Sequence, residues 1–189
     1  QVLPDRRGEF TVSAYQIVKN NLLTRDASNP SLRVQVGERS SRGIEGALSL
    51  AVTPTVRLEA NAALLRARYD DFSEPVGGSL VSRKGKVPTD VPQRVANLWL
   101  DWEASPGWIL GGGARHVGKR YADNANTLVL PSYTTVDLAL RWKFTPQTTV
   151  ALRGFNVFDR FFFTTAYYGG TQWLVGEGRR VELSLLHRF

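Results

Sequence analysis

The strongest constraint on this sequence is a strict alternation of short and long connections between segments in which every second residue is apolar. Three short connections are centred on proline, which presets the backbone angle of a tight turn. They are "VTPT" (52–55), "ASPG" (104–107) and "FTPQ" (144–147). The connections between them are long and polar: "NNLLTRDASNP", "DDFSEPVGGSLVSRKGKVPTD", "ADNANTLVLP" and "RFFFTTAYYGGTQWLVGEG". This rhythm predicts an up-and-down antiparallel sheet with all its long loops at one end.

Eight strands are expected from this pattern. They are Gly8–Lys19, Ser40–Ala51, Val56–Tyr69, Pro92–Glu103, Trp108–Tyr121, Tyr133–Lys143, Thr148–Phe158 and Arg179–Phe189. The alternation is clearest in the sixth strand, where Val136, Leu138 and Leu140 share one face while Asp137 and Arg141 share the other. The pattern does not assign the faces of the strands that begin at Gly8, Trp108 and Thr148.

A membrane barrel explains these strands better than a soluble sandwich, in which a second layer would have to cover each apolar face. No run of about 20 apolar residues could form a spanning helix, but a spanning strand needs only about 9 to 11 residues. Aromatic residues gather near the proline turns, as in an interfacial girdle. They are Trp102, Trp108, Trp142, Phe144 and Phe189. The predicted fold is an all-β, antiparallel, up-and-down transmembrane β-barrel segment.

Composition removes several classes of function. The chain has no cysteine and two histidines, so neither a thiolate nor a histidine-rich metal centre is expected. No serine, histidine and acid form a recognisable catalytic set, and we expect no enzymatic activity. The net charge is +7, but the basic residues are scattered, and no nucleic-acid partner is expected. The chain begins at Gln1 without a methionine or a signal peptide, so we expect a fragment or a processed piece of a longer protein.

Five stretches in chain order resemble the C-terminal part of TonB-dependent outer-membrane receptors, in particular the ferric-siderophore branch. They include "GERSSRGIEGALSLAV", "VPQRVANLWLDWE", "SYTTVDLALRWKF", "LRGFNVFDRFFFTTAYYGG" and the final "GEGRRVELSLLHRF". The resemblance covers essentially the whole chain. It implies that residues 1–189 form the last eight strands of a 22-stranded barrel, without the plug domain and the earlier strands.

The resemblance also implies a function: TonB-dependent transport of a ferric siderophore across the outer membrane of a Gram-negative bacterium. The chain would have no cofactor, because the iron–siderophore chelate is the ligand. Expected partners are the TonB complex, reached through the missing N-terminal region, the barrel-assembly machinery, outer-membrane lipid and lipopolysaccharide. One alternative is a receptor of the same family for haem or cobalamin.

Two alternatives belong to other classes. A self-contained eight-stranded barrel, acting as an adhesin or a structural protein, would have to pair the strand at Gly8 with the strand at Arg179. A soluble ligand-binding β-barrel is disfavoured because its apolar residues would face water.

The most aromatic segment, "FFFTTAYYGGTQW", is the best candidate for ligand contact. The resemblance implies that Tyr167, Tyr168 and Trp173 contact the chelate, with Gln172 as a possible donor and Tyr121 as a lesser candidate. An aromatic girdle or packing within the loop would explain the same residues.

Several basic residues are expected at the external ends of strands: Arg66, Arg68, Arg115, Lys119 and Arg120. They could attract an anionic ferric complex, bind lipopolysaccharide phosphates or pair with carboxylates in the lumen. His116 could lie in the lumen or at the rim, although an isolated histidine is more often structural. In "NVFDR", Asn156 and Asp159 are expected where a strand leaves the membrane.

The C-terminal strand resembles the signal that the barrel-assembly machinery reads. Its alternating residues are Val181, Leu183, Leu185 and the terminal Phe189. His187 departs from the pattern, because an aromatic or apolar residue is usual at that place.

Overall fold

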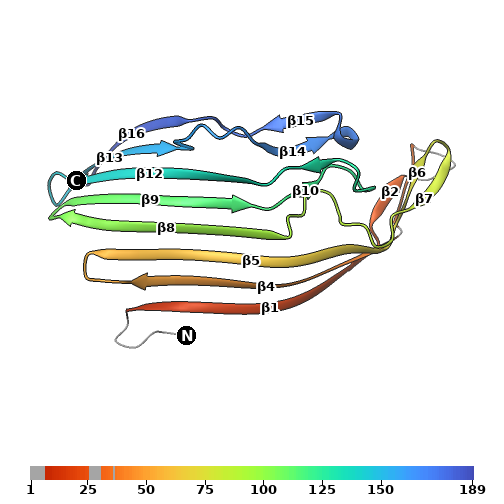
Figure 1. Ribbon diagram of the computed structural model, residues 1–189, viewed down its shortest axis with the longest axis horizontal. Coiled ribbons are helices and arrows are strands. Elements are labelled where there is room, and N and C mark those ends of the chain that lie inside the picture. Colours follow the sequence, from red (N-terminus) through yellow and green to blue (C-terminus); the bar gives the residue numbers. More distant parts are fainter. Residues whose placement is uncertain (1–6, 26–30, 36) are drawn as a thin grey trace.

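The structure is a computed structural model that describes residues 7–25, 31–35 and 37–189. Its main element is one antiparallel sheet of eight strands in chain order (Figure 1). These strands are β1 (Gly8–Asn20), β4 (Glu38–Ala51), β5 (Val56–Asp71), β8 (Arg94–Ser105), β9 (Trp108–Val117), β12 (Tyr133–Lys143), β13 (Thr148–Phe155) and β16 (Arg180–His187). All eight predicted strands are confirmed. Part of the predicted connection 20–30 lies outside the described residues.

The three short turns lie at one end of the sheet, and the long connections lie at the other (Figure 1). Threonine hydroxyls close two of the short turns. The Thr53 hydroxyl accepts a hydrogen bond of 3.0 Å from the Val56 amide, and the Thr145 hydroxyl accepts one of 3.0 Å from the Thr148 amide. A side chain that binds its own backbone two or three residues on stabilises such a turn, so the Thr-Pro sequence fixes both hairpins.

Each long connection forms a small hairpin of its own, which the sequence pattern did not predict. The short strands are β2 (Leu23–Arg25) with β3 (Arg33–Gln35), β6 (Ser73–Val76) with β7 (Ser79–Ser82), β10 (Arg120–Tyr121) with β11 (Val129–Leu130), and β14 (Phe163–Tyr167) with β15 (Gln172–Val175). A 3₁₀ turn, η2 (Tyr168–Gly170), joins the last pair. Within the described residues, no helix is long and apolar enough to cross a membrane.

The register places most of the large apolar strand residues on one side of the sheet, called here the apolar face. Leu58, for example, lies opposite Leu50 on one neighbouring strand and Leu100 on the other. This face is open rather than packed, and the side chain of Leu138 is 52% exposed. The face includes Val12, Ile44, Leu64, Leu98, Leu110, Leu138, Leu152 and Leu183. The same register assigns the faces of β1, β9 and β13, which the sequence left open.

The reverse side, called the polar face, carries hydrogen bonds and ion pairs between strands. Asn97 on β8 donates to Asn61 on β5 at 2.7 Å, and Arg141 on β12 forms an ion pair of 2.6 Å with Asp101 on β8. A sheet with one polar face and one exposed apolar face is suited to the wall of a membrane barrel, in which the polar face lines the lumen and the apolar face contacts lipid.

Aromatic residues of the apolar face gather near the short turns, as predicted for a girdle. The rings of Trp108 and Trp142 are directly opposite in the register and stack with centroids 5.0 Å apart. Phe144 packs its edge against Trp142 at 4.9 Å, and Trp102 is 46% exposed.

The predicted strand Arg179–Phe189 ends two residues early, at His187, and two other predicted strands end earlier still. Trp108–Tyr121 divides after Val117, and Thr148–Phe158 ends at Phe155. Asn156 causes the second break, because it adopts a left-handed φ of 46° and its buried side chain binds the backbone of Arg160 and Glu177. Asn156 therefore lies where the strand ends, as predicted.

The edge strands β1 and β16 lie on opposite sides of the sheet (Figure 1). No pairing joins them in the part of the chain that the structure describes. The chain therefore forms an open wall and not the closed eight-stranded barrel considered as an alternative.

Candidate ligand-binding site

The β14–β15 hairpin projects from the long-loop end of the sheet and carries four of the five predicted ligand residues (Figure 1). Tyr167 ends β14 and lies opposite Gln172 in the register. Tyr168 begins the tip with a positive φ of 51°, which is uncommon for a residue with a side chain. Its side chain is 79% exposed and that of Tyr167 is 53% exposed. The hairpin thus presents two tyrosines to the surroundings.

Trp173 has a different role from the two tyrosines. Its indole N–H donates a hydrogen bond of 2.7 Å to the Gly170 carbonyl, and its ring packs against the edge of Phe163 at 4.7 Å. The polar atom of Trp173 is therefore occupied within the hairpin, as the loop-packing interpretation expects. Gln172 is exposed, and its side-chain amide has no hydrogen bond within the described chain.

The tip of this hairpin rests on the β10–β11 hairpin, which contains the fifth predicted residue, Tyr121. Gly170 adopts a φ of 92°, and a Cβ added there would collide with Leu128 and meet the Cβ of Ala122 at 3.7 Å. Glycine is therefore required for this approach. Tyr121 is half-buried and immediately precedes Ala122. The structure therefore brings the β10–β11 hairpin, which contains Tyr121, against the turn that contains Tyr168.

Arg120 holds the base of the β14–β15 hairpin, and it is only 6% exposed. Its guanidinium donates to the carbonyls of Thr164 and, at 2.7 Å, Phe163. Asp90 lies 3.9 Å from the same guanidinium and accepts a hydrogen bond from the Thr165 hydroxyl. The planar guanidinium group presents several N–H donors at fixed angles and can therefore bind two neighbouring carbonyl oxygens at once. These contacts fix β14 relative to β10.

Of the three roles considered for Arg120, ligand attraction and lipid binding do not fit a side chain that is buried against a hairpin, whereas its ion pair with Asp90 agrees with the third, pairing with a carboxylate. Sequence reasoning missed the contact with the hairpin altogether. Asp90 and Thr165 are 75 residues apart, and no local pattern links them.

The other predicted basic residues divide between the two faces. Arg115 lies directly opposite Asn97, on the polar face. Arg66 and Arg68 lie on the other, outward side of the sheet, because their positions on β5 alternate with those of the polar-face residues. Arg68 binds Asp70 at 2.8 Å, and Lys119 is exposed between β9 and β10.

A further basic pair, which sequence reasoning missed, lies on the polar face near the long loops. Lys19 and Arg39 are directly opposite in the register of β1 and β4. They line a cavity of about 300 Å³, together with Tyr15 and Ile17. Neither has an ion pair within the described residues. The spacing along the chain does not reveal this pair, because the two residues come together only through the register between β1 and β4.

The turn between β10 and β11 is organised by Asp123. Its carboxylate accepts hydrogen bonds from the backbone amides of Thr127 at 2.9 Å and Leu128 at 2.8 Å, and from the Thr127 hydroxyl at 2.7 Å. Burial acts to raise the pKa of Asp123, but these hydrogen bonds outweigh it and lower the pKa below its usual value. The charged carboxylate therefore stabilises the surface on which the tyrosine hairpin rests.

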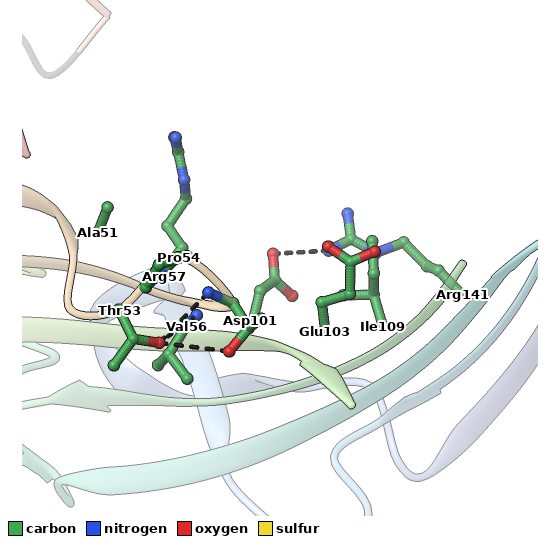
Figure 2. Close-up of a pocket in the computed structure, with 10 residues that line it drawn as sticks. Ala51, Thr53, Pro54, Val56, Arg57, Asp101, Glu103, Ile109 and Arg141 are labelled. Carbon is green, nitrogen blue, oxygen red and sulfur yellow. Dashed lines mark hydrogen bonds and ion pairs between the residues drawn. The ribbon is translucent and has the colours of Figure 1, made fainter. Parts of the chain in front are cut away.

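A second cavity lies at the short-turn end, on the polar face (Figure 2). Its volume is about 270 Å³, and its lining includes Arg57, Asp101, Glu103 and Arg141. Asp101 binds Arg141 at 2.6 Å, and Glu103 accepts a hydrogen bond from the Gly107 amide at 3.3 Å. Asp101 and Arg141 pair with each other and Glu103 binds the short turn, so these three residues are part of the wall structure.

No metal centre is found among the described residues, where no three histidine, cysteine or acidic side chains cluster. His116 lies on the apolar face, opposite Thr134, and binds its hydroxyl at 3.0 Å. It therefore has the structural role considered for it and does not face the lumen.

Together, the exposed apolar face, the polar face, the aromatic girdle and the loop asymmetry define part of the wall of a membrane-spanning β-barrel receptor. Residues 2–157 match the family model described as TonB dependent receptor-like, beta-barrel. The chain belongs to this family, and it is an outer-membrane β-barrel protein of a Gram-negative bacterium.

Known relatives agree with this assignment. The chain is 31% identical over 189 residues to the metal-pseudopaline receptor CntO of Pseudomonas aeruginosa, covering 97% of the chain and 25% of the relative. It is 29% identical over 194 residues to the ferrichrome outer membrane transporter/phage receptor of Escherichia coli (strain K12), covering 98% and 25%. The solved structure of the siderophore receptor PiuA from Acinetobacter baumannii superimposes with a TM-score of 0.86 at 25% identity, covering 98% of this chain and 27% of that one.

The chain therefore spans about a quarter of the length of these relatives. They are receptors and transporters, in agreement with the prediction that the chain is not an enzyme.

Proposed function

We propose that the chain is the C-terminal part of the barrel of a TonB-dependent receptor that takes up a ferric siderophore. The rest of the receptor would supply the earlier strands, the plug and the contact with the TonB complex, as the family resemblance implies. The observation that carries this proposal is the β14–β15 hairpin, whose exposed Tyr167 and Tyr168 are held in place by Arg120 and Gly170.

The chemistry of the site fits such a ligand. A ferric chelate presents a compact organic shell, which exposed aromatic rings and a few polar groups can cover. Gln172 offers a free amide beside Tyr167. Lys19 and Arg39 add unpaired positive charge at the same end of the polar face, which would draw in an anionic chelate. Several relatives are named as receptors for iron chelates, among them the ferrioxamine receptor of Yersinia enterocolitica, 28% identical over 138 residues.

The test uses the full-length receptor in lipid vesicles. Quenching of tryptophan fluorescence is titrated with ferric hydroxamate, ferric catecholate and mixed-ligand chelates, and with haem and cobalamin. We expect one class of ferric chelate to give saturable quenching, weakened about tenfold or more by Tyr168→Ala, as for an aromatic residue that dominates an interface.

The matched control is Phe144→Ala, which removes an exposed aromatic ring at the opposite end of the wall. Its affinity for the chelate should equal that of the wild type. Saturable binding of haem or cobalamin instead, or no response to any ligand by a folded receptor, would contradict the siderophore proposal.

We further propose that the last strand serves as the signal for barrel assembly. Val181, Leu183 and Leu185 lie on the apolar face with exposed fractions of 67%, 73% and 71%, which suits recognition by another protein before lipid surrounds them. Phe189→Ala in the full-length receptor should lower the amount that assembles in the outer membrane. Phe144→Ala should not, and equal assembly of both variants with the wild type would exclude this role.

A further inference from the structure

Three arginines lie together on the outward side of the wall, where the apolar face gives way to the long loops. Arg42 on β4 and Arg66 on β5 are directly opposite in the register. Arg94 on β8 lies opposite Leu64, which is two residues from Arg66 on the same face. All three are exposed, and they line one cavity of about 540 Å³, called here the arginine cluster.

The arginine cluster has no compensating charge within the described residues. None of the three guanidinium groups forms an ion pair. Asp70, further along the same side of β5, is bound to Arg68 at 2.8 Å instead. Like charges directly opposite each other destabilise a strand pair. An anion bound from outside the chain would remove this repulsion between Arg42 and Arg66.

Directly toward the short-turn end, the same face forms an apolar hollow. Gly46, Ala62 and Ala96 pair across β4, β5 and β8, so the wall has almost no side chains there. With Val12 and Leu98 among the lining residues, they form a cavity of about 620 Å³. Arg42 is four residues from Gly46, about 13 Å along the strand. An anionic group at the arginines and a hydrocarbon chain in the hollow would therefore belong to one amphipathic molecule.

We propose that the arginine cluster and the hollow below it bind a phosphorylated glycolipid, the lipid A portion of lipopolysaccharide. The long-loop end of an outer-membrane barrel faces the exterior, so the arginines lie at the headgroup level of the outer leaflet. Guanidinium groups bind phosphate oxygens through paired hydrogen bonds. β4, β5 and β8 each have neighbours on both sides in the sheet, so further barrel strands do not cover the site. This site is independent of siderophore uptake, which uses the opposite face.

The experiment is a titration of the delipidated full-length receptor followed by native mass spectrometry. The probes are bisphosphorylated lipid A, the same lipid without phosphates, and phosphatidylglycerol. We expect bisphosphorylated lipid A to bind the wild type most tightly. Each of Arg42→Gln, Arg66→Gln and Arg94→Gln should weaken binding about fivefold, and the triple variant about a hundredfold.

The matched control is Arg115→Gln, which removes an exposed arginine from the polar face and should leave lipid A binding unchanged. Heat-dependent gel mobility shows that each variant is folded, and the single variants keep the test valid if the triple variant does not fold. Equal binding of lipid A by the folded arginine variants and the wild type would overturn the proposal. Equal binding of phosphatidylglycerol or of the phosphate-free lipid by the wild type would also overturn it.

Discussion

The guanidinium of Arg141 on β12 lies 2.6 Å from the carboxylate of Asp101 on β8, and the contact crosses the intervening strand β9 above Gly111. A Cβ at Gly111 would lie 2.7 Å from Asp101 Oδ1 and 2.8 Å from the Trp99 ring. The absence of a side chain at Gly111 therefore makes room for an ion pair that joins β8 and β12 across β9 on the polar face.

Gly111→Ala should lower the free energy of unfolding by about 1 to 3 kcal/mol, the usual cost of overfilling a packed site. Denaturant titration of the full-length receptor in vesicles, followed by tryptophan fluorescence, measures this change. The control is Gly112→Ala on the apolar face, where the added methyl group meets the end of the flexible Leu138 side chain at 3.2 Å and the Asp137 carbonyl at an ordinary contact distance of 3.9 Å. Equal stability of the two variants would contradict this explanation of Gly111.

The stacked pair Trp108 and Trp142 should stabilise the wall beyond the contribution of each ring alone. A double-mutant cycle with Trp108→Ala and Trp142→Ala should give a coupling energy of about 0.5 to 1.5 kcal/mol. The measurement is again denaturant titration of the full-length receptor. Additive effects of the two substitutions would mean that each ring interacts with lipid and not with its neighbour.

The strands, and the faces of clearly alternating ones such as β12, could be predicted because they depend on local information, whereas the faces of β1, β9 and β13 required the register. Alternation fixes which residues share a face, and the Thr-Pro turns fix where a hairpin closes. The girdle around Trp108 and Trp142 followed from the same pattern.

The support of the ligand hairpin could not be predicted in this way. The contacts of Arg120 with Phe163 and Thr164 join parts of the chain that are more than 40 residues apart. The opposed pairs Lys19 with Arg39 and Arg42 with Arg66 depend on the register between strands, which the spacing along one strand does not reveal. For Trp173, the sequence left ligand contact and loop packing equally open, and its bond to Gly170 supports packing.

Arg120→Lys should loosen the β14–β15 hairpin, because lysine keeps the charge but lacks the fork that binds two carbonyls. Hydrogen exchange in the full-length receptor should become faster over residues 163–175 and stay unchanged in β12. The affinity for the ferric chelate should fall at the same time. Arg115→Lys, an exposed position, is the control and should change neither quantity. Unchanged exchange in Arg120→Lys would show that Arg120 does not hold the hairpin.

The Asp123 turn should respond to acid. The pKa of Asp123 is lower in the folded turn than in an unfolded chain, so its stabilising effect is complete above the unfolded value of about 3.9. This effect is lost as the pH falls through the lower, folded pKa. Hydrogen-exchange protection of the Thr127 and Leu128 amides, corrected for intrinsic rates, should therefore be constant at pH 5 to 7, a range above about 3.9, and fall in stronger acid. In Asp123→Asn, protection should be weaker and should not change with pH. A wild-type turn that keeps its full protection below its folded pKa would contradict this role.

In the membrane, the apolar face of the sheet contacts lipid and the polar face lines the lumen. Residues Val136 to Leu140 of β12 test this arrangement most directly, because they alternate between the two faces and the chain has no cysteine of its own. Single cysteines at these five positions of the full-length receptor in vesicles are spin-labelled, and collisions with oxygen and with a water-soluble nickel reagent are measured. We expect oxygen to dominate at 136, 138 and 140 and the nickel reagent at 137 and 139. The reverse alternation, or no alternation, would contradict the assignment of the two faces.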